Sequence, residues 1–193
     1  MIKMNIIIIH GSNYKDRERI KKYNLLPQNK RHWISWIKEK LEEKEINCFT
    51  PLMPKNWAPV YGEWKKEFEK LPVNEGNILI GHSTGGGFLV RWLGETKKKI
   101  KKLILVAPAK LTMVGYDYFK EVVNFEIDET IKKRVGEIIL FTSNNDDEMI
   151  LESVKLYHEK LGGKLIELKG RGHFLEKQMR TKEFPELLEE ILK

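Results

Sequence analysis

The chain has 193 residues, of which 41% are hydrophobic, and this composition excludes a disordered or collagen-like protein. The charged fraction is 33% and the formal net charge is +7, a surplus that many nucleic-acid-binding proteins share. Only seven of the 35 basic residues are Arg, however, and Arg is the side chain best suited to contact phosphates and base edges. The composition therefore argues against a nucleic-acid partner, and the length predicts one domain over residues 1–193.

The sequence offers no support for a metal site, a disulfide or a membrane segment. Cys48 is the only cysteine, and the five histidines form no HExxH or HxxxH pair. The apolar run Ile6–Ile9 is too short for a signal peptide, and no stretch approaches the roughly 18 apolar residues of a membrane-spanning helix. We therefore expect a cytoplasmic protein that needs no cofactor and does not bind membranes.

Strand-like and helix-like segments alternate along the chain. The expected strands are Ile6–Ile9, Ile46–Phe49 as the weakest, Asn77–Gly81, Leu103–Ala107, Ile138–Phe141 and Lys164–Leu168. All except Ile46–Phe49 are expected to be buried on both faces, Lys164–Leu168 included. Helical periodicity is expected over residues 33–41, 61–71, 86–94, 147–161 and from 183 onward. This alternation predicts an α/β fold: a three-layer α/β/α sandwich with a mainly parallel sheet of about six strands and no large cap domain.

The strongest motif runs from Gly81 to Gly85 and has the pattern Gly-x-Ser-x-Gly, with Ser83 at its centre. It follows an expected strand and opens an expected helix, which is where a nucleophilic serine sits in α/β-hydrolases. Such a turn holds the serine in an unfavourable backbone conformation, and the two glycines let strand and helix approach without a Cβ clash. The alternative is a helix start that Ser83 caps.

A nucleophilic serine needs a histidine as general base and a carboxylate that orients this base. In the chain order of α/β-hydrolases the acid and then the histidine follow the serine. Asp146 and Asp147 come after the fifth expected strand, and His173 lies in a Gly-flanked loop after the sixth. The sequence predicts a catalytic triad of Ser83, Asp147 and His173, with Asp146 as the alternative acid. Asp147 is also placed to cap the helix that follows.

The oxyanion hole of such an enzyme needs two N–H donors. The backbone N–H groups of Thr84, next to the nucleophile, and of Ser12, in the loop after the first strand, are predicted to supply them. His10 is expected to end this strand and not to act as a base. Trp57, His82 and Tyr116 are candidates for the substrate pocket, with simple packing as the alternative for the two bulky aromatic residues.

These motifs resemble the small single-domain α/β-hydrolases of the retinoblastoma-binding-protein-nine (YdeN-like) type. The resemblance rests on the Gly81–Gly85 motif and on the loops that carry the two aspartates and His173. It also includes four further segments and covers about residues 5 to 192: His10-Gly11, His32-Trp33, Thr50–Pro54 and Trp64. The chain departs from the family pattern in the acid loop, where Asn144 and Asn145 add a position, and at Leu151, where proline is usual.

Motifs and resemblance together predict an esterase-like serine hydrolase that cleaves a small ester, thioester or amide through an acyl-enzyme. We expect it to be a monomer or weak homodimer. The alternative is a protein of the same fold with little or no turnover, which acts by binding a protein partner. The basic stretch from Lys15 to Arg31, beside the oxyanion loop, adds the hypothesis of an acidic substrate or partner.

Overall fold

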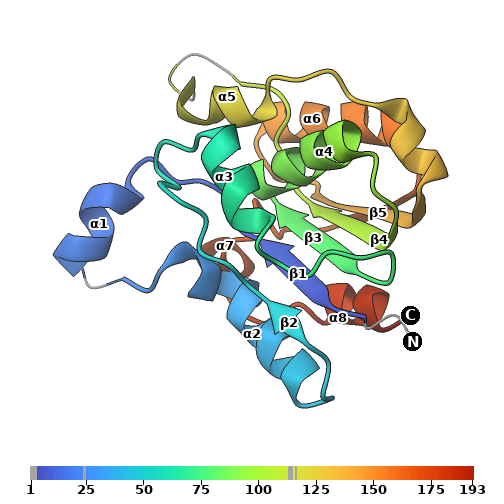
Figure 1. The fold of residues 1–193 in the computed structure, drawn as a ribbon. Helices are drawn as coiled ribbons and strands as arrows, with labels where there is room; N and C mark the ends of the chain where they lie inside the picture. The colour runs from blue at the N-terminus through green and yellow to red at the C-terminus, as the bar shows by residue number, and fades with distance from the viewer. Residues whose placement is uncertain (1–3, 24, 113–114, 116) are drawn as a thin grey trace.

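A fully parallel sheet of six strands forms the centre of the protein, as the computed structural model shows for all residues except 1–3, 24, 113–114 and 116 (Figure 1). The strands are β1 (Ile6–Ile9), β2 (Cys48–Phe49), β3 (Ile78–His82), β4 (Ile100–Val106), β5 (Val135–Ser143) and β6 (Lys164–Leu168). Their order in the sheet is β2-β1-β3-β4-β5-β6. The chain thus moves outward from β1 to β2 and then returns to β3 on the other side of β1. This reversal creates a switch point at the carboxyl ends of β1 and β3, where open α/β sheets bind ligands.

Helices cover both faces of the sheet and give the three expected layers (Figure 1). One face carries α3 (Tyr61–Phe68), α4 (Thr84–Thr96), α5 (Lys120–Val123) and α6 (Glu148–Leu161), and the other carries α2 (His32–Glu42) and α8 (Pro185–Leu192). The structure also contains two short helices, α1 (Asp16–Tyr23) and α7 (Glu176–Met179). The remaining described elements are 3-10 turns at Gln28–Lys30, Asp117–Phe119 and Glu129–Lys133. Figure 1 shows α1 standing out to one side of the sheet. The α/β fold predicted from the sequence is confirmed.

Burial along the strands follows their place in the sheet. Every residue of β1 and β3 is buried, because both strands have neighbours on each side and helices on each face. In contrast, β6 has no buried residue: Lys164, Leu165 and Glu167 are exposed, and Ile166 and Leu168 are half-buried. The expectation that β6 is buried on both faces is therefore wrong. As the edge strand it pairs only with β5, so one side of it has no neighbouring strand.

The turn from β3 to α4 brings backbone segments closer together than side chains allow. A Cβ atom on Gly85 would lie 2.6 Å from the carbonyl oxygen of His10, and one on Gly81 would lie 2.5 Å from the Cα atom of Gly86. Between the two glycines, Ser83 has φ 54° and ψ −122°, a conformation that costs a non-glycine residue about 1–3 kcal/mol. The packing therefore requires both glycines of the motif and holds Ser83 at the switch point.

Replacing Gly85 by Ala is expected to destabilise the protein by about 1–3 kcal/mol or more, because the new methyl group would overlap the backbone at the end of β1. Gly62 in α3 provides a matched control, since a Cβ atom there would have no neighbour within 4 Å. Gly62→Ala should therefore stabilise the helix by about 0.5–1 kcal/mol. Urea unfolding followed by circular dichroism measures both changes. Equal stability of the two variants would contradict the proposed crowding at Gly85.

Candidate active site

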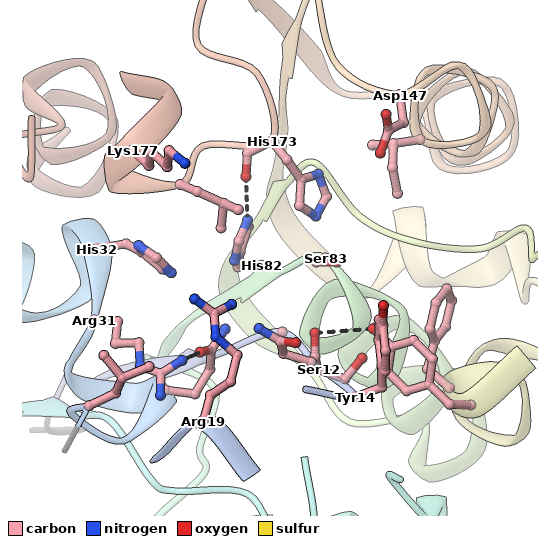
Figure 2. A pocket seen from close by; sticks show the side chains of 18 of the residues that line it. Ser12, Tyr14, Arg19, Arg31, His32, His82, Ser83, Asp147, His173 and Lys177 are labelled. Atoms are coloured by element: carbon pink, nitrogen blue, oxygen red, sulfur yellow. Dashed lines mark hydrogen bonds between the residues drawn. The ribbon is translucent and has the colours of Figure 1, made fainter. Parts of the chain in front are cut away.

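A pocket of about 450 Å³ opens at the carboxyl edge of the sheet. The loops after β1, β3, β5 and β6 border it together with α1, the start of α2 and α7. Both Ser83 and His173 line this pocket, and Figure 2 shows the imidazole of His173 turned toward Ser83. The predicted nucleophile and the predicted base therefore share one cavity, although they are 90 positions apart in the sequence.

His173 is hydrogen-bonded to Asp146 and not to Asp147. Its Nδ1 atom lies 3.0 Å from Oδ2 and 3.2 Å from Oδ1 of Asp146, whose side chain is only 1% exposed. Asp147 begins α6 as its N-cap residue, but its carboxylate is exposed and makes no capping hydrogen bond. The structure thus corrects the choice of Asp147: the alternative, Asp146, is the carboxylate in contact with the histidine.

A tight turn after β5 explains which of the two aspartates faces inward. The backbone N–H of Asp146 donates to the carbonyl oxygen of Ser143 over 3.1 Å, which folds the chain back onto the edge of the sheet. The next residue, Asp147, is the N-cap of α6, and its exposed side chain lines the pocket without a hydrogen bond to His173. The backbone N–H of Asp147 donates to Oδ1 of Asp146 over 2.8 Å and helps to orient the inner carboxylate.

Side chains of the loop after β5 hold the backbone of the loop that carries His173. Three backbone N–H groups donate to them over 2.9 Å each: Gly170 to Asn144 Oδ1, Arg171 to Ser143 Oγ, and Gly172 to Asn145 Oδ1. The two asparagines that depart from the family pattern therefore have a positional role. They fix the histidine loop relative to the turn that presents Asp146.

His82, a candidate pocket residue, lines the pocket and lies next to His173. Its Nε2 atom is 2.9 Å from the carbonyl oxygen of His173, and because a carbonyl only accepts, Nε2 carries the proton (Figure 2). Burial, assisted by the nearby His173, lowers the pKa of His82 well below its usual value. The side chain is thus a neutral donor that positions the backbone of His173.

The loop after β1 runs directly past Ser83. A Cβ atom on Gly11 would lie 3.0 Å from the Cβ atom of Ser83, and the hydroxyl groups of Ser12 and Thr84 are 2.7 Å apart. The structure therefore brings together the two residues whose N–H groups were predicted to form the oxyanion hole. In the described part of the chain, neither of these N–H groups donates a backbone hydrogen bond outside the regular elements.

His10 fixes this loop, in line with its expected place at the end of a strand. The backbone N–H of Met53 donates to Nε2 of His10 over 2.9 Å, so Nδ1 carries the proton and donates to the carbonyl oxygen of Gly11 over 2.6 Å. Complete burial lowers the pKa of His10 to about 4. A neutral histidine therefore joins the oxyanion loop to the segment that precedes α3.

Other predicted pocket residues have different outcomes. Trp57 is half-buried and does not line the pocket, so this prediction is wrong, whereas Tyr116 lies outside the described residues. The pocket is also lined by Arg31, His32 and Lys177, which no motif in the sequence marks as pocket residues. Arg31 and His32 are the N-cap and the first residue of α2, and Lys177 follows the histidine loop, but only the fold shows that these segments meet.

The described residues contain no cluster of three or more His, Cys, Asp or Glu side chains arranged to hold a metal ion. None of the helices among them has the length and apolar character needed to cross a bilayer. The cytoplasmic location stays a prediction from the sequence.

A model of the serine hydrolase family matches residues 25–190 of the chain. The chain belongs to the serine hydrolase family. This match confirms the family resemblance seen in the motifs and the prediction of a hydrolase. No protein of curated function matches the sequence.

Solved structures of similar fold extend over nearly the whole chain. The YdeN gene product from B. subtilis is 19% identical with a TM-score of 0.82, and the match covers 98% of this chain and 97% of that one. A YdeN-like hydrolase from Pectobacterium atrosepticum is 17% identical with a TM-score of 0.61 (96% and 92% covered). Est1E from Butyrivibrio proteoclasticus, solved with ferulic acid bound, is 13% identical with a TM-score of 0.59 (98% and 88% covered). At these identities the likeness shows the α/β-hydrolase fold.

The buried histidines predict a loss of stability on mild acidification. In the unfolded chain His10 protonates near its ordinary pKa of 6.5, whereas in the folded protein it stays neutral down to about pH 4. Because the unfolded state binds more protons in this window, the free energy of unfolding falls as the pH drops, by about 2 kcal/mol for His10 between about pH 7 and about pH 5. Urea unfolding at both values measures the loss.

The variant His10→Gln keeps one donor and one acceptor but cannot be protonated in this range. Its loss of stability over the same pH interval should be smaller than that of the unmodified protein by about 2 kcal/mol. Identical losses would show that His10 is already protonated, or exposed, in the folded protein.

Proposed function

We propose that Ser83, His173 and Asp146 form the catalytic triad of a hydrolase that cleaves a small ester, thioester or amide. The hydrogen bond between His173 and buried Asp146, beside a strained Ser83 in the same pocket, is the observation that supports this most. In an α/β-hydrolase fold this combination is what acyl transfer requires. Every step is supplied by side chains and backbone groups of one domain.

The proposed reaction has two halves. Ser83 Oγ attacks the substrate carbonyl while Nε2 of His173 accepts the hydroxyl proton, and His173 then gives this proton to the leaving group as the acyl-enzyme forms. A water molecule repeats the attack with His173 again as the base, which releases the acid and restores Ser83. Asp146 accepts from Nδ1–H throughout, so that Nε2 stays free to accept, and it stabilises the imidazolium form.

The negative charge on the carbonyl oxygen develops next to the start of α4. We assign its stabilisation to the backbone N–H groups of Thr84 and Ser12, whose side chains are in contact. The N-terminal end of a 13-residue helix adds favourable electrostatic potential at this point. Apolar side chains complete the pocket and would contact the acyl chain: Leu25, Phe119, Met149, Ile150 and Leu175.

A fluorophosphonate probe, which reacts with activated serines, is expected to label the protein, and Ser83→Ala should abolish the labelling. Ser83 lies at the strained turn after β3 and shares its pocket with His173, which Asp146 orients. Intact-mass spectrometry measures the adduct directly. Undiminished labelling of Ser83→Ala would locate the reactive group elsewhere and overturn the proposal.

Asp146→Asn is expected to lower kcat by up to about 10⁴-fold, because an amide can hold His173 in the wrong tautomer and cannot stabilise its charged form. Asp147→Asn is the matched control, since it changes the adjacent carboxylate, which is exposed and lacks the contact with His173. It should leave kcat within about threefold of the unmodified enzyme. The initial rate of p-nitrophenyl acetate hydrolysis measures both. The reverse pattern would restore Asp147 as the acid.

A further inference from the structure

We propose that the active-site pocket selects esters that carry a second, negatively charged group such as a free carboxylate, that Arg19 and Lys177 attract this group, and that Arg31 offers it a hydrogen-bond donor. The inference deepens the proposed function, on which its chemistry rests, by naming the class of substrate. It depends on the positions of these three side chains around Ser83 and not on the net charge of the protein.

The charged lining of the pocket is uneven. Arg19, Arg31 and Lys177 line it together with one carboxylate, that of Asp147. Figure 2 shows the three cations on the same side of Ser83 as His32, whereas Asp147 lies on the opposite side. Among the described residues, Arg19 and Lys177 form no ion pair, so their charges are not neutralised by the protein itself.

Arg31 is fixed in place by a buried carboxylate. Its Nη1 atom donates to Oδ1 of Asp16 over 2.8 Å, and the side chain of Asn56 donates to the other oxygen of Asp16 over 2.8 Å. Asp16 is 1% exposed, so this ion pair is rigid and leaves little net charge. The Nη2 atom of Arg31, however, is buried and has no partner in the described part of the chain, so the folded protein leaves one guanidinium donor unsatisfied. This side of the pocket therefore has more donors than acceptors.

His32 adds a further donor to the same side. The backbone N–H of Glu176 donates to Nδ1 of His32 over 3.1 Å, so the proton of the neutral ring is on Nε2. Burial and then the neighbouring Arg31 lower the pKa of His32 to about 4, which keeps the ring neutral at physiological pH. Among the described residues, this side of the pocket thus has two cations without ion pairs and an imidazole N–H, and Arg31 beside them has a buried guanidinium nitrogen without a partner.

A carboxylate matches this region because it only accepts hydrogen bonds and gains most from charged donors. A substrate ammonium group would meet repulsion from Arg19 and Lys177, and an alkyl end would leave the donors unsatisfied. The chemical class that follows is the monoester of a dicarboxylic acid, or another small ester with a free acid group. Its ester carbonyl would lie at Ser83 while its anionic end lies between α1 and α7.

Three methyl esters of equal chain length test this preference: monomethyl adipate (anionic), methyl hexanoate (neutral) and methyl 6-aminohexanoate (cationic). Methanol release gives kcat/KM for each. We expect the order anionic, neutral, cationic for the unmodified protein. In Arg19→Gln the ratio of the anionic to the neutral ester should fall about 10-fold, the effect of one charged hydrogen bond. Arg19 is exposed, so the variant should fold.

Arg17→Gln is the matched control because it removes the same charge from the same helix. Arg17 does not line the pocket, and two helical positions place it about 200° around the axis from Arg19. In Arg17→Gln the ratio of kcat/KM for the anionic ester to that for the neutral ester should stay within about twofold of the value for the unmodified protein. An equal fall in both variants would mean that the overall charge of the protein attracts anions, and it would overturn the proposed site.

A binding measurement separates this inference from the proposed reaction. Adipate is titrated into Ser83→Ala while the arginine side-chain N–H resonances are followed by NMR, with 1,6-hexanediol as the neutral probe. Adipate should shift these resonances saturably, and an added Arg19→Gln change should abolish the saturable shift. Adipate binding without hydrolysis of any ester would overturn the proposed hydrolase activity and support the anion site. Ester hydrolysis without adipate binding and without preference for the anionic ester would support the hydrolase activity and overturn the anion site.

Discussion

The backbone contact between the end of β1 and the start of α4 determines how the rest of the site is arranged. Gly85 packs against the carbonyl oxygens of Ile9 and His10 at a distance that leaves no room for a side chain. Because the two segments touch through their backbones, the loop after β1 must pass beside Ser83, and Ser12 comes within hydrogen-bond distance of Thr84. A strained serine, a helix N-terminus and a second N–H donor are consequences of one packing constraint. The strain at Ser83 is tolerated because the buried sheet around it fixes both sides of the turn.

The histidine half of the site depends on polar contacts between loops. Ser143, Asn144 and Asn145 hold the loop of His173 through its backbone N–H groups, while the turn that they form directs Asp146 inward. The sequence shows two adjacent aspartates after a strand, and either one satisfies the chain order of a triad. The contact of Asp146 with His173, in a turn closed by the hydrogen bond from Asp146 N–H to the carbonyl oxygen of Ser143, distinguishes them. A difference of one residue in a turn is set by contacts that no periodicity or motif spacing reveals.

Local patterns predicted the layers of the fold because continuous β-branched runs suit strands that are buried on both faces. They did not predict contacts between distant segments. Lys102 stands in a run of lysines that looks like a solvated turn, yet it is buried, and its ammonium group donates to Glu190 O over 2.6 Å and pairs with Glu137 over 2.9 Å. The α7 segment was likewise not expected, since four residues are too few for a recognisable helical period. Its importance arises from the fold, which places Lys177 at the pocket.

The basic stretch between residues 15 and 31 shows how the fold divides a charge that composition presents as a single feature. Within α1, helical periodicity directs Asp16 and Arg19 to the same side, three positions apart, and Arg17 to another. Asp16 is buried and holds Arg31, so the stretch brings two arginines to the pocket: Arg31, whose charge Asp16 largely neutralises, and Arg19, which forms no ion pair among the described residues. The remaining lysines of the helix add to the net charge but do not line the cavity. Selectivity for an anion would therefore depend on the few cations near Ser83. A protein of the same net charge whose α1 turned Arg19 away from the pocket would lack this selectivity.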